Sequence, residues 1–193
     1  YTAKLRRITR PKCVKPLGAT SGLSAEVHAP VSSLPGFLSC VTFNAQCFLS
    51  RIQHINNFLV AYEPAIVFIQ ETWLNKDVEH INCPGYCVVA RRDRSVDQNR
   101  GGIITLCRAS LFPYRVHVHT SACAERMWHY LTLDVGIVVL CNWYRPPGSD
   151  DDIIQIFRDE FQQFAADTQF HIVCGDLNLH HIPWLHYSNA AIT

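Results

Sequence analysis

The sequence predicts a single α/β domain in which two helices pack on largely antiparallel or mixed β-sheets. Short apolar segments recur along the chain, several alternate as half-buried strands do, and two amphipathic stretches each lead into an apolar strand. The 193 residues suit one domain, and 48% hydrophobic and 17% charged residues are typical of a globular protein. No apolar run approaches the roughly 18 residues of a spanning helix, so we expect no membrane partner.

Residues 1–36 are predicted to be a basic, proline-containing leader with little regular structure. They hold four prolines among small polar residues, show neither a helical nor a strand period, and carry six of the 17 basic residues. The net charge of the whole chain is +1, so the remainder is mildly acidic. The leader is either a solvated tail or a segment for nucleic acid or targeting, and the sequence leaves both open.

Ordered structure is predicted to begin at Phe37, in a strand that ends at Asn44. Ser50 is placed to cap an amphipathic helix that ends before Pro64, and residues 65–71 then form an apolar run typical of a buried strand. Further strands are expected over residues 86–90, 101–107, 115–119 and 127–135.

The second half of the chain repeats the order of strand, helix and strand. An apolar strand is predicted over residues 137–144, and it ends where two prolines follow Arg145. Residues 149–152 open a second helix with an apolar stripe. A closing strand over residues 170–175 leads into the segment 176–178.

Three local features have both a functional and a structural explanation. The three aspartates at 150–152 are either metal ligands or favourable charges at a helix start, and their position favours the second. The Gly101-Gly102 pair indicates a tight strand entry, because it lacks the spacing of a phosphate-binding motif. Cys83 and Cys87 lack the second pair of a zinc finger, and the odd count of nine cysteines indicates a reducing compartment.

Polar side chains follow four of the predicted apolar strands at the point where each strand ends. Strand ends that meet at one rim of a sheet are where α/β folds gather functional groups. Each group alone also has a plain explanation as a turn residue, a cap or a half-buried aromatic side chain. The groups are Asn44, Glu71, Tyr144 with Arg145, and Asp176 with Asn178.

The order of these groups resembles the endonuclease/exonuclease/phosphatase superfamily, the deoxyribonuclease I-like fold, and most closely the endonuclease domains of non-LTR retrotransposons. That resemblance implies two packed β-sheets flanked by helices, and metal-dependent hydrolysis of phosphodiester or phosphomonoester bonds. The matching stretches, in the family's order, are Thr42-Phe-Asn44, Ile69-Gln-Glu71-Thr72-Trp73-Leu74, Arg100-Gly-Gly-Ile103, Asn142-Trp-Tyr-Arg-Pro-Pro147 and Gly175-Asp-Leu-Asn178, then His181 and Trp184.

The resemblance also implies roles for the site residues. Glu71 would be the main carboxylate ligand of Mg²⁺ or Mn²⁺, with Asn44 beside it. Asp176 would orient and deprotonate the attacking water, and Asn178 would hold that water or the phosphate. Tyr144 would donate a hydrogen bond to a nonbridging phosphate oxygen.

Three further residues are carried over with less defined roles. Arg145 would either contact a phosphate or anchor a turn, and the sequence leaves both open. His181 and Trp184 match a His-x-x-Trp pattern of the retrotransposon branch and would lie behind the catalytic groups or on the substrate side. We assign none of the histidines as a metal ligand.

One departure from the family concerns its last motifs. A Ser-Ile-Asp strand and a Ser-Asp-His ending do not occur before Thr193, so residues 37–193 are expected to form a partial domain that is truncated at its C-terminus. Because catalytic groups act as a unit, we expect weak or absent activity. The alternatives are an inactive retroelement-derived fragment that binds nucleic acid through the leader, or a phosphatase of the same superfamily.

The Tyr-Arg-Pro-Pro and His-x-x-Trp patterns favour the retrotransposon branch over a phosphatase. That branch implies DNA as the substrate and an intracellular, nuclear location. It leaves open whether a reverse transcriptase region belongs to a longer parent polypeptide.

Overall fold

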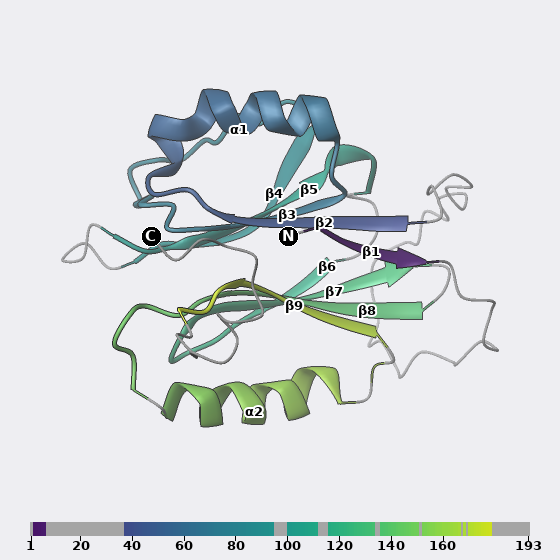
Figure 1. The fold of residues 1–193 in the computed structure, drawn as a ribbon, viewed down its shortest axis with the longest axis vertical. Helices are drawn as coiled ribbons and strands as arrows, with labels where there is room; N and C mark the ends of the chain where they lie inside the picture. Colours follow the sequence, from purple (N-terminus) through teal and green to yellow (C-terminus); the bar gives the residue numbers. More distant parts are fainter. Residues whose placement is uncertain are drawn as a thin grey trace, which may run out of the picture.

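The computed structural model in Figure 1 has four layers, with two β-sheets packed in the middle and one helix on the outer face of each sheet. The structure describes residues 2–6, 37–94, 100–111, 116–133, 136–150, 152–166, 168 and 170–178. It confirms the expected α/β sandwich of two mixed sheets flanked by helices.

The first sheet has five strands in the order β1-β2-β3-β5-β4. β2 and β3 are parallel because the chain crosses between them through helix α1, and the other neighbours are antiparallel. Their bounds are β1 Thr2–Arg6, β2 Phe37–Asn44, α1 Phe48–Tyr62, β3 Ile66–Gln70, β4 Tyr86–Arg92 and β5 Ile103–Arg108.

The second sheet has four strands in the order β6-β7-β8-β9. Helix α2 connects the parallel strands β8 and β9, and the other neighbours are antiparallel. The bounds are β6 Val116–Thr120, β7 Glu125–Leu133, β8 Gly136–Tyr144, α2 Asp152–Ala165 and β9 Phe170–Asp176, with a short 3₁₀ helix at Ala109–Leu111 after β5.

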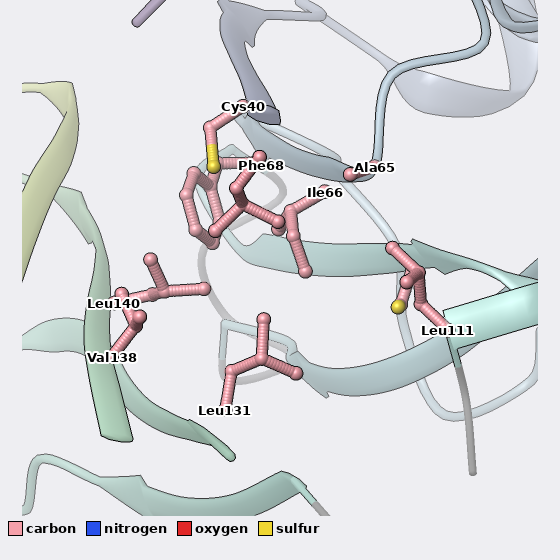
Figure 2. Packing of buried hydrophobic residues seen from close by; sticks show 10 residues of the cluster. Cys40, Ala65, Ile66, Phe68, Leu111, Leu131, Val138 and Leu140 are labelled. Carbon is pink, nitrogen blue, oxygen red and sulfur yellow. The ribbon is translucent and has the colours of Figure 1, made fainter. Parts of the chain in front are cut away.

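The core lies between the two sheets, where apolar side chains of both meet. Figure 2 shows Cys40 and Phe68 of the first sheet facing the side of the second sheet that carries Leu131 and Leu140. Separate apolar clusters join α1 and α2 to the outer face of their own sheet. β3 is therefore buried on both faces, which explains its uninterrupted apolar sequence.

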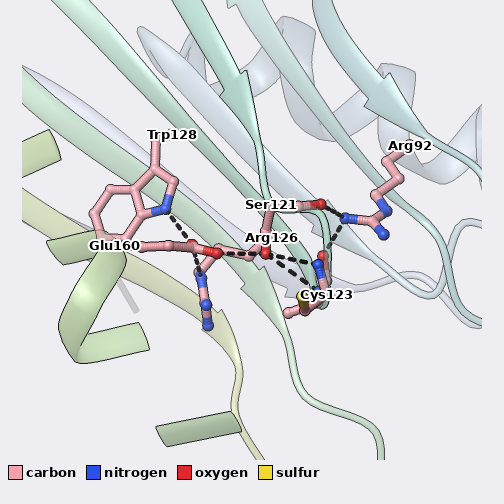
Figure 3. A network of polar contacts seen from close by, with 7 residues as sticks. Arg92, Ser121, Cys123, Arg126, Trp128 and Glu160 are labelled. Atoms are coloured by element: carbon pink, nitrogen blue, oxygen red, sulfur yellow. Dashed lines mark hydrogen bonds and ion pairs between the residues drawn. The ribbon is translucent and has the colours of Figure 1, made fainter. Parts of the chain in front are cut away.

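Polar contacts also fasten α2 to the second sheet, as Figure 3 shows. The Glu160 carboxylate of α2 accepts hydrogen bonds from Arg126 Nε at 2.7 Å, Trp128 Nε1 at 2.8 Å and Ser121 Oγ at 2.5 Å. The Arg126 side chain is completely buried, and its guanidinium lies 4.5 Å from the ring centroid of Trp143. These contacts hold the start of β7 in place.

Part of the predicted leader has regular structure. Residues 2–6 form strand β1, which pairs antiparallel with β2 along its length. The sequence shows no strand period there, because five residues are too short for their alternation to be recognised. Residues 1 and 7–36 lie outside the described residues, so the remaining extent of the leader stays a prediction.

Helix α1 begins before the predicted cap. Its first residue is Phe48, and Ser50 donates a hydrogen bond to the Cys47 carbonyl instead of capping the helix. The N–H groups of Cys47 and Phe48 donate to the carbonyls of Glu71 and Thr72, at 3.0 and 2.8 Å. Those carbonyls accept hydrogen bonds from the helix start in place of a side-chain cap, and they connect it to the segment after β3.

The structure also bears on the cysteines and on membrane spans. The eight cysteines among the described residues are free thiols. No helix in the described part of the chain is long and apolar enough to cross a membrane.

Candidate active site

Four of the predicted site residues lie at one rim of the sandwich. Asn44 is the last residue of β2, Glu71 follows β3, Tyr144 ends β8 and Asp176 ends β9. Because β2 and β3 are parallel, as are β8 and β9, each pair of strand ends lies at the same edge. The structure thus brings together side chains from both sheets that the sequence analysis had grouped by their position after apolar strands.

Asn44 connects the two carboxylates of this rim. Its Nδ2 donates to Glu71 Oε1 at 2.7 Å and to Asp176 Oδ2 at 2.9 Å, while its Oδ1 accepts the backbone N–H of Gln46 at 3.1 Å. One amide therefore holds a carboxylate from each sheet, and its hydrogen bonds offset the repulsion between the two negative charges.

Tyr144 contacts the same carboxylate from the second sheet. Its hydroxyl donates to Glu71 Oε1 at 3.1 Å. Burial, then the negative charge of Glu71 and this hydrogen bond, raise the pKa of Tyr144 to about 12. The hydroxyl therefore stays protonated at neutral pH and keeps a hydrogen to donate.

The segment that carries Glu71 has an unusual backbone. Glu71 and Trp73 have φ values of 49° and 52°, in the left-handed region that non-glycine residues rarely adopt. The N–H groups of Thr72 and Trp73 donate to the carbonyls of Gly102 and Gly101, at 3.2 and 2.9 Å. Together with the bonds from the start of α1, these contacts fix the conformation that directs Glu71 into the site.

Asn178 and Arg145 join the two loops that follow β9 and β8. Asn178 Nδ2 donates to the Arg145 carbonyl at 2.8 Å, and its backbone N–H lies 3.3 Å from Asp176 Oδ1. The Arg145 guanidinium donates to the carbonyls of Asn178 and Ser149, at 3.4 and 2.8 Å. Arg145 thus makes the turn-anchoring contacts, and phosphate binding by either residue stays a prediction.

His181 and Trp184 lie outside the described residues. Their place behind the catalytic groups or on the substrate side stays a prediction.

A buried polar network beneath the rim was not predicted. Gln70 Nε2 donates to Asn142 Oδ1 at 2.8 Å, and Asn142 Nδ2 donates to the Ile104 carbonyl at 3.0 Å and Thr105 Oγ1 at 3.2 Å. These bonds join the sheets directly below Glu71 and Tyr144. The sequence did offer a signal, because Gln70 and Asn142 are polar residues in apolar strands. A polar side chain that is buried in this way needs a hydrogen-bond partner.

Glu125 is a second residue that the sequence analysis missed. It lies opposite Tyr144 in the β7–β8 ladder, its Oε2 accepts the N–H of Gly102 at 2.7 Å, and its Oε1 lies 2.6 Å from Arg94 Nε. A single acid at a strand start gives no signal for these contacts. The Gly101-Gly102 pair makes a tight approach here, because a Cβ on Gly102 would lie 2.7 Å from Thr72 Oγ1.

One oxygen at this rim is open to a hard divalent cation that has few protein ligands. Glu71 Oε2 accepts no hydrogen bond from the described residues, and Mg²⁺ is commonly held by one or two carboxylates with water in the other positions. No group of three or more His, Cys, Asp or Glu side chains suited to a metal lies within the described ranges. The Asn44 oxygen faces Gln46 instead of Glu71, so its place as a ligand stays a prediction.

Comparison with known proteins agrees with this arrangement. The sequence model of the endonuclease/exonuclease/phosphatase family matches residues 41–192. No curated protein matches the sequence.

Three solved structures illustrate the similarity in fold. An AP endonuclease from Leishmania major has a TM-score of 0.58 at 15% identity, covering 72% of this chain and 54% of its own. The endonuclease domain of TRAS1, a telomere-specific non-LTR retrotransposon, has a TM-score of 0.56 at 13% identity, covering 73% and 59%. D. rerio TDP2, complexed with a single-strand DNA product, has a TM-score of 0.50 at 16% identity, covering 77% and 64%. The chain therefore spans between 54% and 64% of their lengths.

Proposed function

Because the chain belongs to the endonuclease/exonuclease/phosphatase family, we propose that it is a metal-dependent DNA endonuclease of the retrotransposon type. Members of this family hydrolyse phosphate esters as nucleases or phosphatases. The observation that carries the proposal is the contact of Asn44 with the carboxylates of Glu71 and Asp176, beside the Tyr144 hydroxyl.

Glu71 would hold the metal ion through Oε2, the oxygen that accepts no hydrogen bond from the described residues. A bound Mg²⁺ or Mn²⁺ would polarise a phosphate oxygen and stabilise the leaving oxyanion. Asn44 and Tyr144 both donate to Glu71 Oε1, so they orient this carboxylate before any substrate arrives.

Asp176 would act on the attacking water. It takes one proton as the water oxygen forms its bond to phosphorus, and the bond from phosphorus to the leaving oxygen breaks. Asn44 and the Asn178 N–H hold one oxygen each of this carboxylate. Tyr144 would turn its hydrogen toward a nonbridging phosphate oxygen as negative charge builds there.

The choice of DNA and of the retrotransposon type has separate support. The neighbours of similar fold include AP endonucleases, a retrotransposon endonuclease domain and a protein with a single-strand DNA product. The stretch Asn142-Trp-Tyr-Arg-Pro-Pro147 matches the retrotransposon branch, and its Tyr144 lies in the site.

Nicking of supercoiled plasmid DNA tests this proposal. We expect weak nicking with Mg²⁺ that stops with a chelator and returns when Mg²⁺ is restored. Glu71→Gln should abolish it, because the amide keeps the shape of the side chain and loses the charge that holds the ion. Glu63→Gln is the matched control, since Glu63 is exposed at the end of α1, before the start of β3, whereas Glu71 follows the end of β3. Absence of nicking by the wild type, or equal nicking by Glu71→Gln, would contradict the proposal.

A further inference from the structure

Trp73 is an exposed aromatic residue beside the candidate site. Its side chain is 36% exposed, and its φ of 52° is unusual for a bulky residue. Such a conformation is energetically unfavourable and persists only where neighbouring contacts fix it. The hydrogen bond from its N–H to the Gly101 carbonyl supplies one such contact.

Arg100 lies over the Trp73 ring. The centre of its guanidinium is 5.7 Å from the ring centroid, and the residue is exposed. An aromatic ring with an adjacent guanidinium offers both a stacking surface and a positive charge. Proteins that bind single-stranded nucleic acid commonly combine these two chemical features.

A continuous chain of contacts joins this pair to the catalytic rim. Trp73 follows Glu71 by two residues, and Arg94 Nη1 donates to the Arg100 carbonyl at 3.2 Å. Arg94 Nε is also paired with Glu125 at 2.6 Å, and Glu125 lies opposite Tyr144 in the β7–β8 ladder. A strand whose phosphate reaches the rim would therefore have its neighbouring nucleotide close to Trp73.

We infer that Trp73 and Arg100 form a platform on which an unpaired base stacks, next to the phosphate that is cleaved. The inference rests on the proposed function, since it names the form of DNA that the same site accepts. In a duplex the faces of the bases are covered by their neighbours, whereas an unpaired base offers its face to the indole ring. The arginines favour a polyanionic strand at this place.

Binding of fluorescein-labelled single-stranded DNA of about 12 nucleotides tests the platform by anisotropy. All proteins carry Glu71→Gln, so that binding is measured without cleavage and independently of whether the wild type nicks DNA. Trp73→Ala should weaken binding by roughly 5- to 100-fold, and Trp73→Phe by much less, because it retains a ring. Tyr62→Ala is the matched control, since Tyr62 is an exposed aromatic residue at the far end of α1.

Oligonucleotides with one abasic position locate the stacked base. At one position the missing base should reproduce the loss caused by Trp73→Ala, and the two changes together should weaken binding no further. Arg100→Gln should lower the salt slope by about 0.7, the value for one contact to a single strand. Unchanged affinity of Trp73→Ala, or an equal loss on every abasic oligonucleotide, would overturn the inference even if plasmid nicking is confirmed.

Discussion

At the scale of single residues, the site depends on backbone conformations that its residue types do not favour. Glu71, Trp73 and Asn178 have φ values of 49°, 52° and 44°. Sequence reasoning assigns such conformations to glycine, so it gave no signal at the first two positions. The contacts that fix the segment of the first two come from Gly101 and Gly102, about thirty residues later in the chain, and from the start of α1, and only the folded structure shows them.

We expect the Tyr144 hydroxyl to take part in the reaction. Tyr144→Phe removes the donor to Glu71 Oε1, which lies 3.1 Å away, and the hydrogen that would reach the phosphate. The rate of plasmid nicking at saturating DNA should fall by about 10²-fold, which is typical for the loss of one donor to a developing charge. The rate should be measured from single-turnover time courses, so that product release does not hide the effect.

Tyr86→Phe is the matched control for this substitution. The Tyr86 hydroxyl donates to the Pro64 carbonyl at 2.7 Å, so the control also loses one hydrogen bond and costs about 1 kcal/mol of stability. It should leave the nicking rate unchanged. Equal rates for wild type and Tyr144→Phe would show that the hydroxyl takes no part in the reaction.

At the scale of elements, strand ends were easier to predict than helix starts. The apolar run before Glu71 ended where β3 ends, because burial on both faces demands apolar residues throughout. The start of α1 was misplaced, since its cap is a pair of carbonyls from another segment and no side-chain pattern marks it. The same contacts position Glu71, so the error fell next to the site.

The close approach of β8 and β9 requires a glycine at position 175. Gly175 has a φ of 149°, and a Cβ added to it would lie 1.7 Å from the Trp143 carbonyl oxygen. Gly175→Ala must therefore push the two strands apart and displace the adjacent Asp176. We expect a loss of about 3 kcal/mol in the free energy of unfolding, measured by urea denaturation.

Gly85→Ala separates backbone strain from this steric clash. Gly85 has a φ of 78°, and nothing lies within 4 Å of an added Cβ. Its substitution should cost only about 1 kcal/mol, the price of a left-handed conformation for a residue with a side chain. Equal losses for both variants would contradict the proposed clash at Gly175.

At the scale of the whole molecule, the sequence predicted the helices and the strands other than β1, but not how the sheets are fastened to each other. Apolar periods are local, so they identify strands and helices. The bond from Gln70 to Asn142 joins residues 72 positions apart, and that of Asn44 to Asp176 joins residues 132 apart. The site was found because its groups follow strands in a recognisable order, whereas Glu125 has no such order and was missed.

His129 lies between the two sheets and makes their packing sensitive to acid. It belongs to β7, its Nε2 is 2.9 Å from Thr105 Oγ1 in β5, and its ring stacks on Phe68 of β3. Asn142 donates to the same Thr105 oxygen at 3.2 Å, so His129 belongs to the buried polar network that joins the two sheets. Burial lowers the pKa of His129 to about 3.

The lowered pKa predicts how stability changes with pH. Below pH 6.5 the unfolded chain takes up a proton on His129 and the folded chain does not, so stability falls as pH falls toward 3. Between pH 7.5 and 5.5 we expect the wild type to lose about 1.4 kcal/mol more than His129→Gln, which retains a hydrogen-bonding group for Thr105 and does not titrate. Urea denaturation of both proteins at several pH values measures the difference. If the free energy of unfolding falls equally in the two proteins, His129 is not the source of the acid sensitivity, because only residue 129 differs between them.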